Sequence, residues 1–264
     1  MPKVKALVLR TAGTNCDAET EYAFGKAGAE PRRVHINRIL EKKGRVLRDY
    51  HILVLPGGFT YGDDIAAGKI LANILRFHLQ EDIREFLQEG KLILGICNGF
   101  QALVKSRLLP AVDGGGSQEA TLTGNDSNRF ETRWTYLKAC SGKSVFVEEG
   151  QLLYMPVAHA EGKFVTRDDG VLDRLRKSSQ IVFRYVNEKG ESDGFPYNPN
   201  GSVDDIAGVC DPTGRVLGMM PHPERYVVDV QHPHWQRQVG GKYPEPHGIQ
   251  IFRNAVKYVE KNLL

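Results

Sequence analysis

One stretch decides the fold of this 264-residue chain: Leu92-Ile93-Leu94-Gly95-Ile96-Cys97-Asn98-Gly99-Phe100-Gln101-Ala102-Leu103-Val104. Its first five residues are apolar, small or uncharged, as in a strand buried on both faces of a parallel sheet. Cys97 follows this strand, and the residues after it favour a helix. A glycine two positions before and two after a nucleophile at a strand-to-helix turn is the pattern of a nucleophile elbow. We therefore expect the Cys97 thiol at a sheet edge and a helix N-terminus, where the thiolate is stabilised.

The first hundred residues alternate between strand-like and helix-like segments. Strands are predicted over residues 4–9, 31–36, 52–55 and 92–96, and helices over 17–27 and 80–89. A further helix is expected after Asp63 or Asp64, with Ile65 and Leu75 among its periodic positions. This alternation predicts an α/β fold, a doubly wound and mostly parallel sheet of the flavodoxin-like type.

The rest of the chain is less regular. Further strands are predicted near residues 144–147, 151–157, 181–186, 206–210 and 216–220, and a last helix over 248–261. Pro, His and Gly are frequent between them, so residues 226–247 are expected to form a surface excursion. Because no repeat or break in composition divides the chain, we expect residues 1–264 to form a single domain.

Composition excludes several classes of function. The formal charge is +3, which gives no electrostatic case for nucleic-acid binding. No uncharged stretch is longer than the 13 residues of 92–104, which is too short to span a membrane. The four cysteines are far apart in the sequence, so neither a disulfide framework nor structural zinc is expected. We expect a reduced, cytoplasmic protein without a metal, in which Cys16 packs in the core or a loop and His232, His234 and His247 lie on the surface.

Two other segments supply what an elbow needs. Gly57 and Gly58 follow the strand at 52–55, and their backbone amides, with that of Asn98, are candidate donors to an oxyanion. His222 follows the apolar run 216–220 and is the candidate base. Pro223 disfavours a helical conformation for His222, and Glu224 can hold the imidazole in one tautomer.

Together these segments resemble the triad, or class I, glutamine amidotransferases. The general match is carried by 95–101 and by His222-Pro223-Glu224. A narrower similarity is to the glutaminase subunits of phosphoribosylformylglycinamidine synthases within that family. It rests on Gly13-Thr14-Asn15-Cys16-Asp17, Pro56-Gly57-Gly58-Phe59-Thr60-Tyr61-Gly62-Asp63, Asn128-Arg129-Phe130-Glu131, His159-Ala160-Glu161-Gly162-Lys163-Phe164, Asn198-Pro199-Asn200-Gly201-Ser202 and Pro221-His222-Pro223-Glu224-Arg225.

The resemblance implies that Cys97 attacks the side-chain amide of glutamine, with His222 and Glu224 completing the triad. It further implies that Gly57 or Gly58 and the Asn98 amide hold the oxyanion. Pocket or interface roles are expected for Gln101, Arg129, Phe130, His159 and Glu161. The implied partners are a large ATP-dependent synthetase, which would carry ATP and Mg, and a small third subunit; no cofactor is expected in this chain. The 198–202 loop is a candidate docking element or an exposed turn.

Two other functions stay open on the sequence. A cysteine hydrolase or peptidase of similar fold also carries a cysteine at such a turn, and peptide cleavage without glutamine turnover would favour it. A non-catalytic binding subunit would keep the elbow only as structure. The presence of all three of Cys97, His222 and Glu224 argues against the second alternative.

Overall fold

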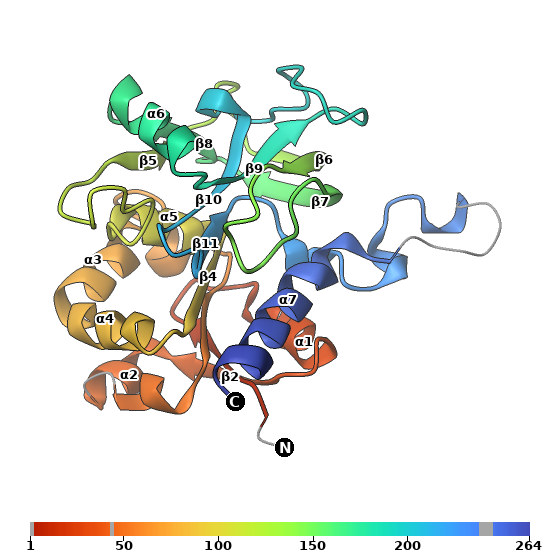
Figure 1. The fold of residues 1–264 in the computed structure, drawn as a ribbon. Helices are drawn as coiled ribbons and strands as arrows, with labels where there is room; N and C mark the ends of the chain where they lie inside the picture. The colour runs from red at the N-terminus through yellow and green to blue at the C-terminus, as the bar shows by residue number, and fades with distance from the viewer. Residues whose placement is uncertain (1–2, 43–44, 238–244) are drawn as a thin grey trace.

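The computed structural model describes residues 3–42, 45–237 and 245–264. Its centre is a nine-stranded sheet of order β2-β1-β3-β4-β11-β10-β9-β6-β7, and β5 pairs with β8 in a second, two-stranded sheet (Figure 1). The strands are β1 Lys5–Arg10, β2 Glu30–His35, β3 Ile52–Leu55, β4 Leu92–Ile96, β5 Ala120–Thr123, β6 Glu131–Ala139, β7 Leu152–His159, β8 Lys163–Thr166, β9 Ile181–Val186, β10 Ile206–Cys210 and β11 Val216–Met219.

The parallel half of the large sheet aligns the strand ends that carry the candidate residues. β2, β1, β3, β4 and β11 pair in parallel. In their register Leu55 lies opposite Gly95, and Ile96 lies opposite Met219. The residues that follow β3, β4 and β11 therefore emerge side by side at one edge of the sheet. This confirms the predicted doubly wound α/β fold.

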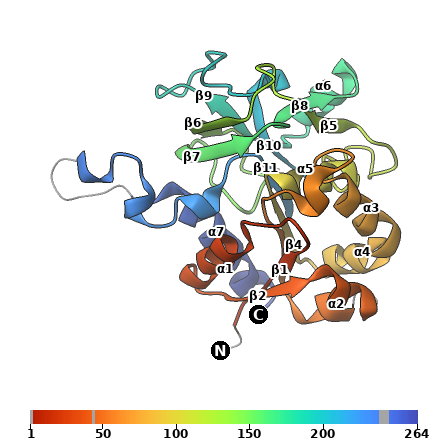
Figure 2. The ribbon, with the colours of Figure 1, turned by 180° about the vertical axis from the view of Figure 1, so that it is seen from behind.

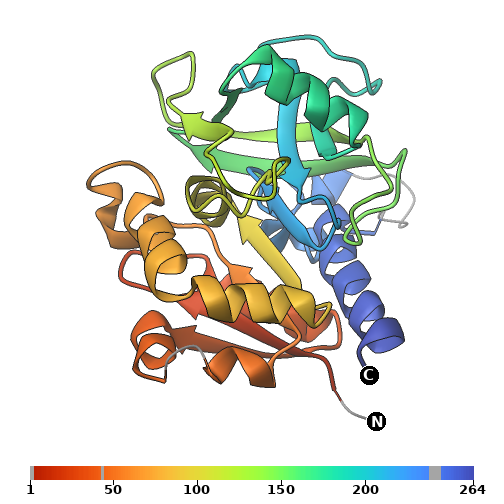
Figure 3. The ribbon, with the colours of Figure 1, turned by 60° about the vertical axis from the view of Figure 1, so that its left-hand side comes forward.

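Helices cover both faces of the sheet (Figures 2 and 3). The helices α1 (Asp17–Lys26) and α7 (His247–Asn262) pack together on one face. The other face carries α3 (Lys69–His78), α4 (Gln80–Gln88) and α5 (Asn98–Lys105). The short α2 (Ile36–Glu41) follows β2, and α6 (Asp169–Lys177) packs on β8. Within the described residues, no helix is both long and apolar enough to span a membrane.

The second half of the large sheet is antiparallel and was only partly predicted. β10, β9, β6 and β7 extend β11 through antiparallel pairs. The strands at 181–186, 206–210 and 216–220 and the strand near 151–157 are confirmed. β5, β6, β8, α2 and α6 were not predicted. The expected strand at 144–147 is wrong: these residues form turns, and Phe146 enters the core without pairing.

The helix expected after Asp63 begins later than predicted. Gly68 caps α3 in the left-handed conformation, and its N–H donates to Oδ1 of Asp63 at 3.1 Å. The carboxylate therefore closes a loop of residues 63–68 instead of starting a helix. Ile65 lies in that loop and is 73% exposed, so its predicted place on the helix is wrong.

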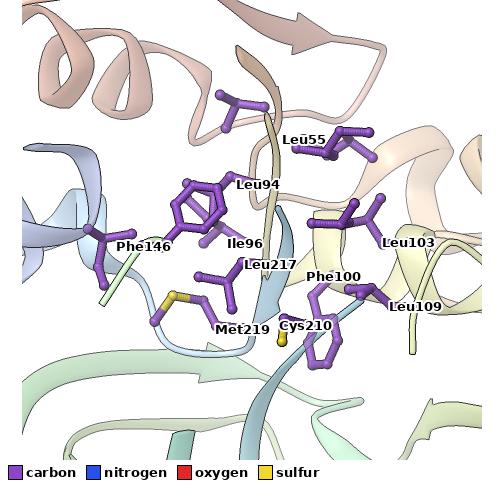
Figure 4. Close-up of a cluster of buried hydrophobic side chains, with 14 of the residues drawn as sticks. Leu55, Leu94, Ile96, Phe100, Leu103, Leu109, Phe146, Cys210, Leu217 and Met219 are labelled. Atoms are coloured by element: carbon purple, nitrogen blue, oxygen red, sulfur yellow. The ribbon is translucent and has the colours of Figure 1, made fainter. Parts of the chain in front are cut away.

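The closest packing in the core is between α5 and the strands beneath it. Figure 4 shows Phe100 and Leu103 of α5 among Leu94, Ile96, Leu217 and Met219. A Cβ on Gly218 would lie 2.0 Å from the Phe100 ring, and a Cβ on Gly99 would lie 1.9 Å from the Leu55 carbonyl oxygen. Since such contacts are forbidden, glycine at both positions lets the helix rest directly on the sheet.

We expect Gly99→Ala to destabilise the fold by about 1–3 kcal/mol, because the added methyl group forces α5 away from β3. Urea unfolding followed by circular dichroism measures this change. Gly124→Ala is the matched control: its Cβ meets nothing within 4 Å, so its free energy of unfolding should stay within about 0.5 kcal/mol of wild type. Equal stability of the two variants would contradict the argument.

Candidate active site

Cys97 lies at a strained turn between β4 and α5. Its φ and ψ are 50° and −105°, a left-handed conformation that non-glycine residues rarely adopt. The surroundings hold it there: its N–H donates to the Met219 carbonyl at 2.8 Å, and its carbonyl accepts from the Gln101 amide at 3.0 Å. The thiol is 5% exposed, and Sγ lies 3.7 Å from the Ala158 carbonyl of β7. This is the geometry predicted for an elbow.

His222 and Glu224 form a buried pair just beyond β11. His222 has the extended conformation predicted before a proline, with φ −102° and ψ 90°. Its Nδ1 lies 2.6 Å from Oε1 of Glu224, and the two residues are only 2% and 1% exposed. Among the described residues, His222 Nε2 has no recorded hydrogen-bond partner. The carboxylate therefore fixes one ring nitrogen and leaves the other for chemistry.

The charges around His222 favour its protonated form. Burial alone lowers the pKa of the imidazole, but the Glu224 carboxylate and then the Cys97 thiolate oppose it. The nearby thiols of Cys16 and Cys97 act in the same direction. The net effect holds the pKa of His222 well above its ordinary value. A protonated imidazole close to a cysteine is an arrangement that activates a cysteine nucleophile.

The Gly57–Gly58 turn meets this pair from the β3 side. A Cβ on Gly57 would lie 2.7 Å from Cε1 of His222, so only glycine lets the turn approach the ring. A bridge between Thr14 and Gly58 holds the turn against the loop after β1. Within the described part of the chain, the amides of Gly57, Gly58 and Asn98 have no recorded acceptor. These three N–H groups are therefore available to donate to an oxyanion, which is the role that the sequence predicts for them.

The Asn98 side chain has a role that the sequence did not indicate. It is 1% exposed, and its Oδ1 accepts from the amide and the hydroxyl of Thr60 at 3.1 and 2.7 Å. Its Nδ2 donates to Asp63 and to Gln101, both at 3.0 Å. Asn98 thereby ties the loop after β3 to the elbow helix.

Gln101 and Glu161 continue this polar network toward β7. Gln101 Nε2 donates to the Glu161 carbonyl at 2.6 Å. The Glu161 carboxylate accepts from the Ala67 amide at 3.3 Å and lies 3.8 Å from the Lys105 ammonium. Lys105 is almost buried, and burial lowers its pKa. The network joins α5, the loop before α3 and the end of β7.

His159 is a second buried imidazole near the site. It is 3% exposed, and its Nδ1 lies 3.1 Å from Asn125 Oδ1. Burial, followed by the nearby charge of His222, lowers the pKa of His159 to about 4. His159 is therefore neutral at pH 7.

Arg129 and Phe130 lie on the surface. Arg129 is exposed, and Phe130 is 50% exposed beside Phe59, which is 47% exposed. The two phenyl rings are 6.4 Å apart between centroids. Since Phe59 directly follows Gly58, this aromatic pair borders the candidate site.

The 198–202 loop is neither an exposed turn nor a docking element. Asn198, Asn200 and Ser202 are 7%, 0% and 4% exposed. Asn200 donates to the Gly162 carbonyl at 2.9 Å, and Ser202 Oγ accepts from the Phe164 amide at 2.9 Å. These polar side chains hydrogen-bond to the backbone of the segment that follows His159. Because they are buried inside the chain, the interpretation of this loop as a docking element is wrong.

Two histidines of the predicted excursion are packed among aromatic rings. His232 lies 5.7 Å from the ring of Trp134 and 5.6 Å from that of Tyr226, between centroids. His247 Nδ1 accepts from the Tyr154 amide at 2.8 Å. Both side chains are still partly exposed and His234 is exposed, so all three histidines lie at the surface as expected, two of them with ordered contacts. Residues 238–244 of the excursion lie outside the described residues.

Comparison with known proteins identifies the family. The model of the CobB/CobQ-like glutamine amidotransferase domain matches residues 3–259. The chain belongs to this glutamine amidotransferase family.

The similar proteins in this family include several that carry the same name. The chain is 48% identical to phosphoribosylformylglycinamidine synthase subunit PurQ of Dehalococcoides mccartyi, over 99% of this chain and 100% of that protein. It is 45% identical to the protein of the same name from Archaeoglobus fulgidus, over 98% of each.

Solved amidotransferase structures agree with the fold. A chain from the structure of PurLQS from Thermotoga maritima matches with a TM-score of 0.74 and 32% identity, over 98% of this chain and 100% of that one. The glutaminase domain of Trypanosoma brucei CTPS matches with a TM-score of 0.54 at 14% identity, over 97% and 94% of the two chains, and shows the fold alone. The family membership decides against the peptidase and the non-catalytic subunit.

Replacing Glu224 by Gln removes the carboxylate charge and keeps the side-chain shape. We expect the pKa of His222 to fall by about 1–3 pH units, because the charge that opposes the cost of burying the imidazolium is lost. NMR titration of the His222 ring measures this pKa. Glu81→Gln is the control, since Glu81 contacts Arg84 on the exposed face of α4 and should leave the His222 pKa unchanged; a His222 pKa that does not respond to Glu224→Gln would contradict the assignment.

Proposed function

We propose that this chain is the glutaminase subunit of a phosphoribosylformylglycinamidine synthase, with Cys97, His222 and Glu224 as its catalytic triad. The reaction hydrolyses glutamine and supplies ammonia that converts formylglycinamide ribonucleotide to formylglycinamidine ribonucleotide in purine synthesis. The observation that carries the proposal is the His222–Glu224 pair, 2.6 Å apart and buried, beside an elbow cysteine on the neighbouring strand end.

In the first half-reaction, Cys97 Sγ attacks the side-chain carbonyl carbon of glutamine. The new C–S bond forms as the carbonyl π electrons move to oxygen, and the oxyanion accepts hydrogen bonds from the Asn98 amide and the Gly57 or Gly58 amide. His222 then gives its Nε2 proton to the amide nitrogen. The C–N bond breaks, ammonia leaves, and a γ-glutamyl thioester remains on Cys97.

In the second half-reaction, neutral His222 removes a proton from water, and the hydroxide attacks the thioester carbonyl. The same amides hold the second oxyanion. Its collapse breaks the C–S bond, releases glutamate and restores the Cys97 thiolate beside the imidazolium. Glu224 keeps the ring orientation and tautomer constant through both steps.

The other site residues serve binding in this proposal. Gln101 and Glu161, at the end of the network from Asn98, line the glutamine pocket, and neutral His159 borders it. The exposed pair Phe59 and Phe130, with Arg129, forms part of the docking surface for the synthetase. This placement is supported by the position of Phe59 next to the Gly57–Gly58 turn.

Ammonia in water at neutral pH is largely protonated and does not act as a nucleophile. The chain is therefore proposed to dock on a large ATP-dependent synthetase, with a small third subunit, as the name PurLQS suggests for the T. maritima complex. ATP and Mg belong to the synthetase in this proposal, and this chain holds no cofactor. We further propose a cytoplasmic location, where purine precursors are made, and one amidotransferase domain over residues 1–264.

Cys97→Ser tests the nucleophile. In the assembled complex we expect glutamine-dependent synthesis to disappear while synthesis from added ammonia stays near the wild-type rate, because only the glutaminase chemistry is lost. A coupled assay with each nitrogen source measures both rates. His222→Ala should lower the glutamine-dependent rate by about 10²-fold or more. Loss of both rates in Cys97→Ser would indicate a structural role for Cys97.

Phe130→Ala tests the docking surface. We expect weaker association with the synthetase, by about 10-fold in Kd, because an exposed aromatic anchor is removed. Analytical ultracentrifugation or surface plasmon resonance with the purified synthetase measures it. Phe77→Ala is the control, since Phe77 is 67% exposed on α3 and lies outside the aromatic pair. Equal Kd values for both variants would contradict the placement.

A further inference from the structure

Cys16 lies beside the His222–Glu224 pair, although its sequence position is far from both. It precedes α1 and is 1% exposed. One side-chain atom from each of Cys16, His222 and Glu224 lies within 4.8 Å of the other two. A Cβ on Gly57 would lie 3.2 Å from the Cys16 Sγ and 2.7 Å from the His222 ring. The Gly57 turn therefore packs against both this thiol and the imidazole.

The Cys16 side chain is held in one orientation. Arg225 Nη2 donates to Sγ at 3.2 Å, and the thiol donates to Asn15 Oδ1 at 3.2 Å. Arg225 is itself fixed by Glu19, with Nε 3.2 Å from Oε2. These contacts restrict rotation of the Cys16 side chain and keep its sulfur facing the imidazole.

The Cys16 backbone fixes the loop from the other side. Its N–H donates to the Gly57 carbonyl at 3.3 Å. Its carbonyl accepts from the Thr20 amide at 3.0 Å and from the Thr20 hydroxyl at 2.7 Å. Cys16 thus joins the start of α1, the turn that carries the oxyanion donors, and the base.

The thiol is neutral in this environment. Burial raises the pKa of Cys16, and although a hydrogen bond to His222 opposes this, the net direction is upward. A divalent cation does not suit the cluster, because the Arg225 guanidinium already contacts the sulfur and the Nδ1–Oε1 distance of 2.6 Å is that of a hydrogen bond. Cys16 is therefore suited to hold groups in place and not to bind metal or attack substrate.

We propose that Cys16 is a positioning residue for glutamine hydrolysis: its thiol, held by Arg225, keeps the His222 ring and the Gly57 turn at a fixed spacing. This inference rests on the proposed function. The spacing matters because the proton donor and the oxyanion donors must reach two atoms of the same carboxamide. A displacement of about 1 Å between such groups can cost about 10²-fold in rate.

The proposal also predicts a change in pH dependence. The groups that face His222 are Cys97 from the elbow, Cys16 from the loop before α1, Glu224 and Arg225 from its own segment, and His159 from β7. The Cys16 sulfur, within 4.8 Å of a ring nitrogen, can accept from the protonated ring and supports that form. Its loss should lower the pKa of His222 and move the alkaline limb of kcat/KM to lower pH, because the reaction needs the imidazolium.

The experiment compares Cys16→Ala and Cys16→Ser in the assembled complex with its synthetase. Cys16→Ala should lower the glutamine-dependent kcat by about 10- to 100-fold with little change in KM, and should shift the alkaline limb downward. Cys16→Ser keeps a hydroxyl that can hydrogen-bond and should recover most of the rate. Synthesis from added ammonia should be unchanged in both variants.

Cys210→Ala is the matched control, because Cys210 is 0% exposed and lies in β10 within the core. It should keep the wild-type kcat and pH profile. The proposal is overturned if Cys16→Ala behaves like Cys210→Ala, or, should Cys16→Ala fail to fold, if Arg225→Gln, which releases the Cys16 sulfur, keeps the wild-type pH profile and kcat. An inactive Cys97→Ser with a fully active Cys16→Ala would reject this inference alone, whereas an active Cys97→Ser would reject the proposed function.

Discussion

The site depends on how closely α5 approaches the sheet. Gly99 lies against the carbonyl of Leu55, and Gly218 leaves room for Phe100, so the helix has no space for an added methyl group. This contact sets the position of the first turn of α5 and, with it, the strained conformation of Cys97. A helix held farther out would allow a relaxed turn, and the thiol would no longer be presented at the ends of β3, β4 and β11. The packing of α5 on the sheet therefore offsets the conformational energy cost of the strained Cys97 backbone.

A second constraint is electrostatic. His222 and Glu224 are both almost fully buried, and a charged pair in such a place is costly unless it is well hydrogen-bonded. The short Nδ1–Oε1 contact provides such a bond, and the nearby thiols of Cys16 and Cys97 also favour the charged ring. The loss of any single member leaves the remaining charge in a poor environment.

The sequence predicted the parallel half of the fold and the elbow, because both follow from local patterns. The short apolar run 92–96, bounded by Lys91 and by a glycine-flanked cysteine, favours a buried strand followed by a tight turn. What the sequence did not predict depends on contacts between distant residues. The ties from Asn98 to Thr60 and the place of Cys16 beside His222 join segments far apart in the chain. The antiparallel strand β6 was missed because charged residues such as Arg133 and Lys138 obscure its alternation, and the buried 198–202 loop has the composition of an exposed one.

The strand β7 contacts both Cys97 and His222. The Ala158 carbonyl faces the Cys97 thiol, and the Pro156 carbonyl accepts the His222 amide at 2.8 Å. Both acceptors belong to the antiparallel half, whereas Cys97 and His222 follow strands of the parallel half. A small shift of one half of the sheet relative to the other would thus move Cys97 and His222 together. A protein bound to the antiparallel half would therefore change the positions of both residues without contacting either of them.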